Sequence, residues 1–540
     1  MNRHVSLPSR AALLAVLVLV ACGSGSDDKG SSGGGGNASG ASGGLGATGG
    51  AGATGGAGGS SSSCLAPSVA CGASCVNTNT DAANCGLCGY ACAAGESCCT
   101  GSCSTGCALS ITSLSTTQGP LAGGTWVEIQ GTGFADGAKV FFGSSRAPAI
   151  TVDAQNLRAQ TSPHLAGNVD VRVEQGAEKS VRGAAFRYAS YGFEGPWEKV
   201  GMPAPRAAGG ISRLQDGRVL VTGGRQASLV GSQDNSADLY DPSTHKTTAV
   251  PGKMGSARIA HGQVTLLSGK VLVVGGFYGA TPNAELFDPS SSSFKATAGQ
   301  PSVPQSTAFP TLLADGRVLV TSLGSMGALT YDPGADAFSA VPGAPLMNQY
   351  TPVRLLDGKV LLAGRSASSP VYLYDPETGG FTPGGPSPSA GTGFPSFVNG
   401  AFVLPDGRVA AVDGSGSAVV SLFDPKALAD GFKPAPYELQ ESTHSSGVTL
   451  MGDGSLFRIA GATVITSQCA AFGWVFSKRV ERIDPVGQKV EWFEDLPAAV
   501  WNLSAFMLGD GSIIATGGEV CGGAEAHSYL YFLKGRPPPA

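Results

Sequence analysis

The sequence has few charged residues and few histidines for its length. Charged residues make up 14% of the 540 positions, the formal net charge is −5, and there are six histidines. A protein that binds nucleic acid through its phosphates needs a concentrated basic surface, which this composition does not supply. Six histidines also leave little material for a metal centre built from imidazole ligands. We therefore expect no nucleic-acid partner, no metal and no cofactor.

Long stretches with helical periodicity are scarce, and after the N-terminus no apolar run is long enough to cross a bilayer. Short runs rich in Val, Leu and Phe are instead bounded by Gly, Asp and Pro, which is typical of strands joined by turns. The chain is also too long for a single hydrophobic core. These features predict an all-β protein of several domains.

The N-terminus has the features of an export signal. Basic residues precede an apolar run at 11–20 that is too short to span a membrane, and small residues follow it. The ending Leu-Val-Ala-Cys22 resembles the bacterial lipobox, in which the cysteine sulfur carries diacylglycerol; the alternative is an ordinary signal peptide with a chance cysteine. The resemblance implies a signal peptide at 1–21, a lipidated Cys22 bearing palmitate-type chains, and a lipid anchor in the membrane. Gly23 then favours the outer membrane or cell surface.

Residues 22–63 follow as the lipidated cysteine and a linker made almost wholly of Gly, Ser, Ala and Thr. Such a segment has too little apolar surface to offset the entropy lost on ordering. We expect a disordered tether with an r.m.s. reach on the order of 35 Å, which would hold the next domains clear of a membrane.

Ten cysteines lie within residues 64–107. They are Cys64, Cys71, Cys75, Cys85, Cys88, Cys92, Cys98, Cys99, Cys103 and Cys107. Because so short a segment cannot bury an adequate core, this density in an exported chain predicts a disulfide module. The spacing Cys85-Gly-Leu-Cys88 also suits zinc, but the even count and the lack of histidine favour disulfides. The run from Thr80 to Cys99 resembles the stigma-specific-type cysteine-rich repeats, which implies a surface module.

Residues 108–190 contain short alternating strands separated by Gly, Asn and Asp, which predicts a small β-sandwich. The string Gly119-Pro-Leu-Ala-Gly-Gly-Thr-Trp-Val-Glu-Ile-Gln-Gly131 and the closing Phe186-Arg-Tyr188 resemble an IPT/TIG domain. That resemblance implies an immunoglobulin-like fold that acts as a spacer or contact module, with no catalytic residue.

A repeat dominates residues 191–540. An Asp-Gly or Ser-Gly turn followed by an apolar strand occurs seven times, from Asp216-Gly-Arg-Val-Leu-Val-Thr-Gly-Gly224 to Asp510-Gly-Ser-Ile-Ile-Ala-Thr-Gly-Gly518. Most copies also carry a later Asp-Pro turn. A period of roughly fifty residues with these features resembles kelch repeats. It implies a seven-bladed β-propeller, favoured over six blades, in which the segment around Trp197 pairs with the strand at Tyr529 and closes the ring.

Loops at one rim of such a propeller are where ligand contacts would gather. Counting back from each turn selects the candidate rim residues Arg206, Arg258, Gln305, Tyr350, His444 and Trp501. The residues that stand seven positions before each turn, such as His261, lie on the same rim. Guanidinium groups suit carboxylates and aromatic rings suit sugar faces, so the rim predicts an unknown protein or glycan ligand. The alternative is that Arg206 and Arg258 only brace neighbouring loops.

Cys469 and Cys521 are the two propeller cysteines, in loops of adjacent blades on that rim, and we expect a disulfide between them.

The propeller architecture is also that of galactose-oxidase-like copper enzymes. Thr443-His444-Ser445 resembles the Tyr-His-Ser stretch of that family, with Thr443 where the metal-ligand tyrosine would stand. A second copper histidine and a crosslinked tyrosine have no counterpart in the right place, so we predict no catalytic residue. We expect a cell-surface binding or adhesion protein without enzymatic activity. An extracellular galactose-oxidase-like or other carbohydrate-active enzyme is the alternative.

Overall fold

The computed structural model describes residues 69–538, except 73, 80, 100, 205, 207, 226–232, 277–282, 303–306, 323–326, 346–349, 365–367, 389–399, 413–417, 444–445, 465–473 and 520–528. The expected signal peptide, Cys22, the tether, Cys64, Gln305, His444, Cys469 and Cys521 therefore lie outside the described residues. Cys75 and Trp501 are placed only through the strands that contain them.

Almost all regular structure in the described part is β, as expected. The one helical element there is a short 3₁₀ turn, Pro425–Asp430. Nowhere in the described ranges is there a helix with the length and hydropathy needed to cross a bilayer.

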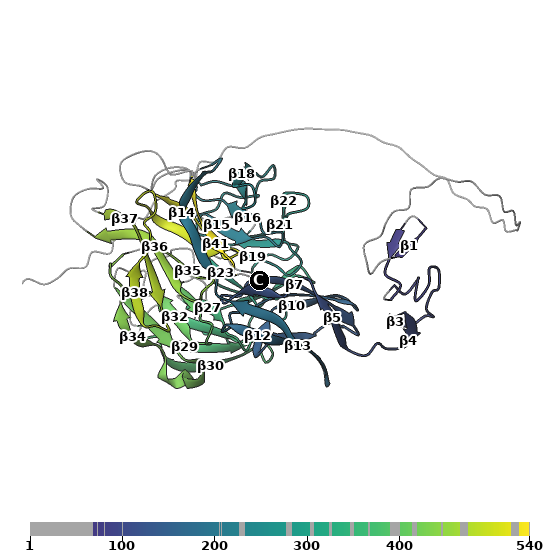
Figure 1. Ribbon diagram of the computed structural model, residues 1–540. Helices are drawn as coiled ribbons and strands as arrows, with labels where there is room; N and C mark the ends of the chain where they lie inside the picture. Colours follow the sequence, from purple (N-terminus) through teal and green to yellow (C-terminus); the bar gives the residue numbers. More distant parts are fainter. Residues whose placement is uncertain are drawn as a thin grey trace, which may run out of the picture. The chain divides into compact units, whose positions relative to one another are not determined.

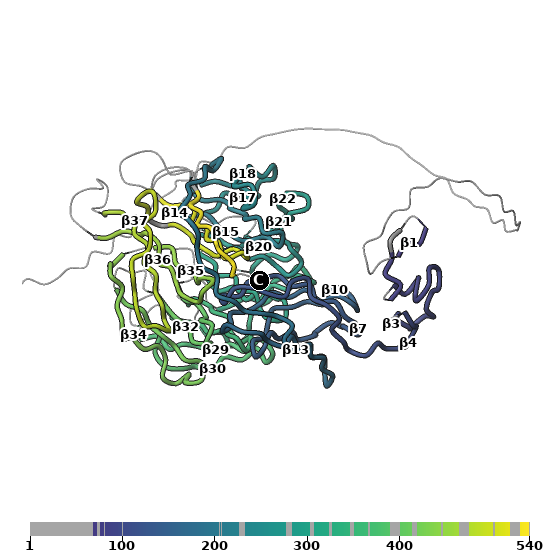
Figure 2. Tube along the Cα trace, viewed as in Figure 1, coloured from purple at the N-terminus to yellow at the C-terminus, as the bar shows by residue number. Residues whose placement is uncertain are grey.

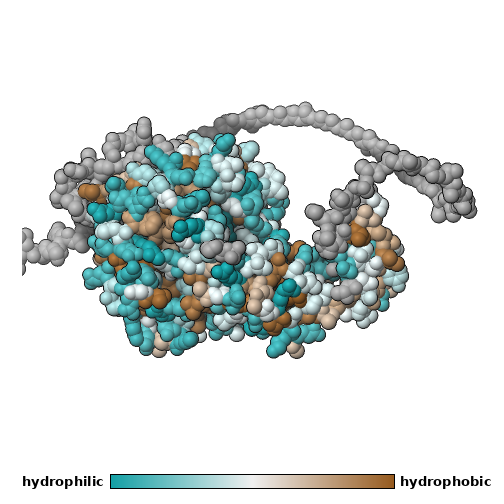
Figure 3. Space-filling model, viewed as in Figure 1, coloured by the Kyte–Doolittle hydropathy of each residue, from teal (hydrophilic) through white to brown (hydrophobic). Residues whose placement is uncertain are grey.

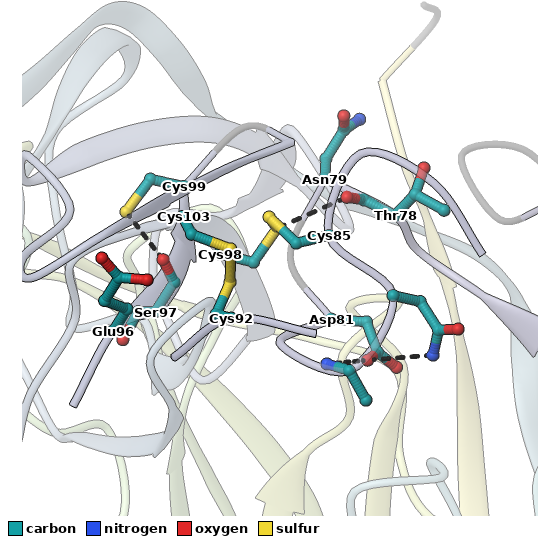
Figure 4. Close-up of a disulfide and its surroundings, with 12 residues drawn as sticks. Thr78, Asn79, Asp81, Cys85, Cys92, Glu96, Ser97, Cys98, Cys99 and Cys103 are labelled. Carbon is teal, nitrogen blue, oxygen red and sulfur yellow. Dashed lines mark hydrogen bonds between the residues drawn. A yellow bond between two sulfur atoms is a disulfide. The ribbon is translucent and has the colours of Figure 1, made fainter. Parts of the chain in front are cut away.

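The cysteine-rich module contains two small hairpins and several disulfides. Figure 4 shows the disulfide between Cys92 and Cys103 with its surroundings. β1 (Val69–Cys71) pairs with β2 (Ser74–Val76), and β3 (Ser97–Cys99) pairs with β4 (Ser102–Ser104). The four described disulfides are Cys71–Cys88, Cys85–Cys98, Cys92–Cys103 and Cys99–Cys107. The predicted disulfide module is thus confirmed for these eight cysteines.

Three sulfur atoms in this module, those of Cys85, Cys92 and Cys103, lie within 4.8 Å of one another. Each belongs to a disulfide, and a metal needs the thiolate form of cysteine. The close approach of these sulfurs therefore reflects two neighbouring disulfides.

Residues 110–189 form a β-sandwich of two sheets, ordered β10-β11-β7-β5 and β6-β13-β12-β8-β9. The strands are β5 (Ser110–Leu114), β6 (Gln118–Pro120), β7 (Trp126–Thr132), β8 (Lys139–Phe142), β9 (Ser145–Ala147), β10 (Ala149–Asp153), β11 (Asn156–Gln160), β12 (Gly167–Gln175) and β13 (Glu178–Ala189). Alternate residues face inward, so Ile129, Phe142 and Phe186 are fully buried between the sheets. The expected immunoglobulin-like domain is present.

The part of the chain that the structure describes after residue 191 contains seven four-stranded antiparallel sheets, here called blades 1 to 7. Figure 1 shows how their strands are arranged. Blade 1 is β15 (Gly210–Arg213), β16 (Val219–Thr222), β17 (Ala237–Asp241) and β18 (Lys246–Ala249); blade 2 is β19 (Gly262–Thr265), β20 (Val271–Val274), β21 (Ala284–Asp288) and β22 (Ser293–Ala296). Blade 3 is β23 (Ala308–Leu312), β24 (Val318–Ser322), β25 (Leu329–Asp332) and β26 (Ala337–Ala340); blade 4 is β27 (Tyr350–Arg354), β28 (Val360–Gly364), β29 (Pro370–Asp375) and β30 (Gly380–Pro386).

The remaining blades have the same order. Blade 5 is β31 (Ala401–Val403), β32 (Val409–Val412), β33 (Val419–Phe423) and β34 (Lys433–Glu438); blade 6 is β35 (Gly447–Leu450), β36 (Leu456–Val464), β37 (Trp474–Asp484) and β38 (Lys489–Trp492). Blade 7 is β39 (Trp501–Met507), β40 (Ile513–Glu519), β41 (Tyr529–Arg536) and, from the front of the region, β14 (Gly192–Gly201).

Strand β14 completes blade 7 by pairing with the last strand of the chain, as the sequence predicted. Glu198 lies opposite Phe532 and Val200 opposite Leu530 in an antiparallel register. Figures 1 and 2 show this early strand beside the yellow C-terminal one. Trp197 is 5% exposed, and its indole N–H donates to the carbonyl oxygen of Glu494 at 3.0 Å. The N-terminal strand thus covers an edge that would otherwise lack a partner.

The hydrophobic cores lie between adjacent blades. One cluster joins Leu220 and Leu239 of blade 1 to Phe287 of blade 2, and Phe294 packs on Phe287 with ring centroids 4.9 Å apart. Related aromatic pairs occur in blades 3, 4 and 5. In blades 2 to 5, the aromatic residue before the Asp-Pro turn and the one after it therefore fill the gap between blades.

The paired glycines of the repeat are needed for contact between blades. A Cβ atom on Gly223 would lie 2.6 Å from the carbonyl oxygen of Arg258 in the next blade. The equivalent Gly517 of blade 7 would place a Cβ atom 2.7 Å from the carbonyl oxygen of Arg206. A side chain at either position would displace the neighbouring backbone.

The IPT/TIG-like domain contacts the propeller at the Asp-Gly turns. The N–H groups of Arg146, Ala149 and Leu121 donate to the carbonyl oxygens of Leu356, Ala314 and Gly452 at 2.7, 3.2 and 3.1 Å. Each acceptor comes directly before the Asp of an Asp-Gly turn, in blades 4, 3 and 6. The domain is thus bound to this end of the propeller, whereas the sequence predicted a spacer or contact module.

Figure 3 shows that the visible surface of the described residues is mostly hydrophilic or neutral, with brown hydrophobic residues scattered among them. Leu87 of the cysteine-rich module and Val486 of blade 6 are the most exposed large hydrophobic residues described, at 72% and 68%.

Candidate functional site

The innermost strands of the blades line a central channel. β15 lies beside β19, β19 beside β23, β23 beside β27, β27 beside β31, and β35 beside β39. Each of these strands runs toward the Asp-Gly turn of its blade, or the Ser268-Gly269 turn in blade 2, because the turn follows the strand in the sequence. The last residue of an inner strand is therefore near the IPT/TIG-like domain, and its first residue is at the opposite end.

Two half-buried arginines occupy the channel end that this domain covers. Arg213, the last residue of β15, donates a hydrogen bond to the carbonyl oxygen of Gly124. Arg354, the last residue of β27, donates to the hydroxyl of Ser162 at 3.3 Å. Burial lowers the pKa of both guanidinium groups to about 10, so both remain cationic at neutral pH. Their partners both come from the IPT/TIG-like domain, which closes this end.

A cavity of about 160 Å³ lies toward the other end of the channel, between blades 1, 2, 3 and 7. Its wall comes from the first residues of β15, β19 and β23 and from the middle of β39. Ile211, Phe309 and Phe506 supply partly exposed apolar surface there. Gln263 and Ser504 supply polar groups. Among the described residues that line this cavity, none is Asp, Glu, Lys or Arg.

A chain of hydrogen bonds sets the state of His261, which also lines the cavity. The Thr222 hydroxyl lies 2.6 Å from Gln263 Oε1 and 2.7 Å from His261 Nε2. Because Oε1 can only accept, Thr222 must donate its single hydrogen to Gln263, and His261 Nε2–H must donate to Thr222. Burial, followed by the nearby Arg258 and Arg206 charges, lowers the pKa of His261 to about 3. The imidazole is therefore neutral at physiological pH.

Arg206 is 1% exposed and makes an extensive set of internal hydrogen bonds in blade 1. Its guanidinium lies 2.8 Å from Asp238 and 3.4 Å from Asp234. It also donates to the carbonyl oxygens of Gly223 and Ser236 at 2.9 and 3.0 Å. The side chain therefore links Gly223 to the segment 234–238, which is a bracing role of the kind that the sequence left open.

Arg258 repeats this arrangement in blade 2. It is fully buried, pairs with Glu285 at 2.8 Å, and donates to the carbonyl oxygen of Gly275 at 2.7 Å. Burial lowers the pKa of the guanidinium, while Glu285 opposes that shift. The geometry again favours bracing over ligand contact, because neither arginine has an exposed face to offer.

Blade 6 carries a buried pair of the same kind built from different positions. Arg458, from strand β36, pairs with Glu481 through its Nε at 2.6 Å. Burial raises the pKa of Glu481 above its usual value, and Arg458 opposes that shift. The acids Asp238, Glu285 and Glu481 all stand three residues before the Asp of an Asp-Pro turn. An acidic residue three positions before an Asp-Pro turn is therefore the sequence signal that marks these buried pairs.

Tyr350, another predicted rim residue, is 8% exposed and donates its hydroxyl to the carbonyl oxygen of Pro370 at 3.1 Å. Trp501 begins the inner strand β39. The structure thus brings none of the described rim side chains Arg206, Arg258 and Tyr350 into the channel cavity.

Thr443, which the sequence resemblance placed at the position of a metal-ligand tyrosine, is fully buried. Its hydroxyl lies 2.7 Å from that of Ser446, which in turn donates to the carbonyl oxygen of Ala460 at 2.9 Å. Thr443 thus has a local structural role.

A second cleft of about 450 Å³ lies between Thr125 and Trp126 of the IPT/TIG-like domain and the turns of blades 1 and 7. Asp216, Asp241 and Asp510 line it. Each carboxylate accepts hydrogen bonds within its own turn, from Arg218, Ser243 and Ser512 respectively. The acidity of this cleft is therefore explained by turn formation.

The residues of the channel cavity were only partly visible in the sequence. His261 was on the predicted rim because it stands seven residues before a turn, but Phe309, Phe506 and Ser504 were not singled out. Strand alternation alone does not say which side of an inner strand faces the channel.

Comparison with known proteins gives one domain match and several similar structures. Residues 109–188 match the IPT/TIG domain family. No curated protein sequence matches the chain. Solved structures that are similar include a fungal alcohol oxidase of the AA5 family in complex with copper, with 17% identity, a TM-score of 0.48, and coverage of 65% of this chain and 77% of that one. Another is virginiamycin B lyase from Staphylococcus aureus, with 12% identity, a TM-score of 0.45, and coverage of 64% and 99%. These neighbours are propeller proteins, and similarity this distant carries no argument about activity.

Proposed function

We propose that this protein is a binding protein displayed at a bacterial cell surface, which presents the propeller to a glycan or protein ligand. In this proposal Cys22 carries the lipid anchor, the Gly/Ser-rich segment is the tether, and the end of the channel opposite the IPT/TIG-like domain receives the ligand. The order of these segments along the sequence supports display, because the anchor and the tether precede every folded domain.

One structural observation carries the binding half of the proposal. The IPT/TIG-like domain covers the Asp-Gly end of the propeller and supplies the partners of Arg213 and Arg354. Ligand contact is therefore directed to the opposite end, where the channel cavity lies. The described wall of that cavity has apolar and neutral polar groups, a composition suited to binding.

Display can be tested with the full chain and a Cys22→Ser variant. Cells expressing each are fed an alkyne fatty acid, and intact cells are treated with a protease that cannot enter. The proposal predicts lipid label on the wild type, none on Cys22→Ser, and digestion of the wild type on intact cells. Unlabelled wild-type protein, or protein protected until the cells are lysed, would contradict display.

Ligand binding is tested separately with the purified soluble protein starting after the tether. It is applied to a glycan array and to intact cells of other strains. Saturable binding to a defined glycan or surface protein is expected. Turnover of a carbohydrate without saturable binding would instead favour the enzymatic alternative.

A further inference from the structure

We infer that the channel cavity binds the terminal ring of an uncharged glycan. This inference rests on the proposed binding function and narrows its ligand class. The cavity has two partly exposed phenylalanine rings, Phe309 and Phe506, on the inner strands of blades 3 and 7. Aromatic rings present flat apolar faces that match the C–H face of a pyranose.

The charge of the cavity wall selects against acidic sugars. No cationic side chain is among its described lining residues, and His261 is neutral because its pKa is lowered to about 3. Arg206 and Arg258 are close enough to His261 to lower its pKa, but each is paired with a buried carboxylate. A sialic or uronic acid would lose its hydration without gaining a counter-ion, which is unfavourable.

The polar groups of the cavity wall can accept hydrogen bonds that sugar hydroxyls donate. Both N–H hydrogens of Gln263 are already donated, to the hydroxyl of Ser212 at 3.0 Å and the carbonyl oxygen of Leu220 at 3.1 Å. Its Oε1 accepts from Thr222 at 2.6 Å and retains a second lone pair. The Ser504 hydroxyl can donate or accept. A neutral polyol can satisfy both groups, whereas a carboxylate cannot donate to Gln263.

The experiment uses the purified protein on arrays of neutral oligosaccharides, ending in galactose, glucose or mannose, and of acidic ones, ending in sialic or uronic acid. We expect binding to a neutral set. Phe309→Ala should weaken that binding about tenfold, since removing an aromatic contact costs on the order of 1.4 kcal/mol. Phe309→Tyr keeps the ring face and should restore most of the affinity.

The matched control is Phe402→Ala, which removes a partly buried phenylalanine from the inner strand of blade 5, outside the described lining of the cavity. Thermal unfolding of both variants checks that each is folded. Equal loss in Phe309→Ala and Phe402→Ala would overturn the inference, and so would binding to acidic glycans alone. Capture of a protein ligand with no glycan binding would overturn the inference while the proposed function stands. Absence of binding to any glycan or cell would overturn both.

Discussion

The guanidinium group of Arg258 is enclosed between Glu285 and the backbone of Gly275, with none of the side chain exposed. A buried ion pair of this kind adds little net stability to the folded protein, because both charges lose their hydration. Loss of one partner is costly, since it leaves the other charge buried and unpaired. The same reasoning applies to Arg206 with Asp238 and to Arg458 with Glu481.

Substitution Arg258→Met should therefore lower the free energy of unfolding by about 3–5 kcal/mol. The double variant Arg258→Met/Glu285→Leu should recover most of that loss, because no unpaired charge remains. Urea denaturation followed by intrinsic fluorescence measures both. Arg218→Met is the control, since Arg218 pairs with Asp216 at the surface and should cost less than about 1 kcal/mol. If Arg258→Met is as stable as Arg218→Met, Arg258 does not have the bracing role.

His261 should make the protein sensitive to mild acid. Its pKa is about 3 in the folded protein against 6.5 normally, so the unfolded chain binds the proton more readily. The free energy of unfolding therefore falls as pH drops below about 6.5. Between pH 7 and 5 this residue should account for about 2 kcal/mol of lost stability. The measurement is denaturant unfolding of the wild type and of His261→Gln across that pH range. If the free energy of unfolding depends on pH in the same way in both proteins, the predicted role of His261 is wrong.

At the scale of elements, β14 closes the propeller by pairing with β41 from the other end of the region. Trp197 anchors it by packing with Tyr531 and Leu533. A strand edge left without this cover presents unpaired N–H and C=O groups, which favours association between molecules.

Trp197→Ala should lower the free energy of unfolding by about 3–5 kcal/mol, the usual cost of removing a buried aromatic side chain. Deletion of residues 192–201 should go further and cause aggregation, visible as a shifted size-exclusion profile. Trp492→Ala, at a 39% exposed tryptophan on β38, is the control and should have a small effect. A monomeric deletion variant with unchanged stability would show that the ring does not need this strand.

For the whole molecule, the IPT/TIG-like domain and the propeller should unfold together. Their contact includes backbone hydrogen bonds to three blades and the packing of Trp126 and Ile150 against the core of blades 2 and 3. Arg213 and Arg354 would lose their partners if the domain were removed.

A chain starting at residue 191 should therefore melt at a lower temperature than one starting at residue 108. Each kcal/mol lost lowers the midpoint by about 2 °C for folded units of this size. Differential scanning calorimetry of the longer chain should give one transition that contains both domains. Two separate transitions, with the propeller midpoint unchanged by truncation, would show that the contact adds no stability.

Local features of the sequence were enough to predict much of this architecture. Asp216-Gly217 and the later copies mark hairpins wherever they occur, because positive φ at glycine is a property of one residue and its turn. Cysteine density in the module and inward alternation in the sandwich are likewise readable over short stretches, and the recurrence of the turns was enough to pair Trp197 with the last strand.

The tertiary structure alone decided which residues could serve a ligand. Arg206 and Arg258 are buried rather than exposed because carboxylates from strands β17 and β21 lie opposite them. Phe309 and Phe506, about 200 residues apart in the sequence, line one cavity because the ring brings blades 3 and 7 to the same channel. The domain placed by sequence as a spacer or contact module covers one end of that channel because its strands meet the turns of blades far apart in the chain. Such contacts depend on non-local geometry, which no short segment encodes.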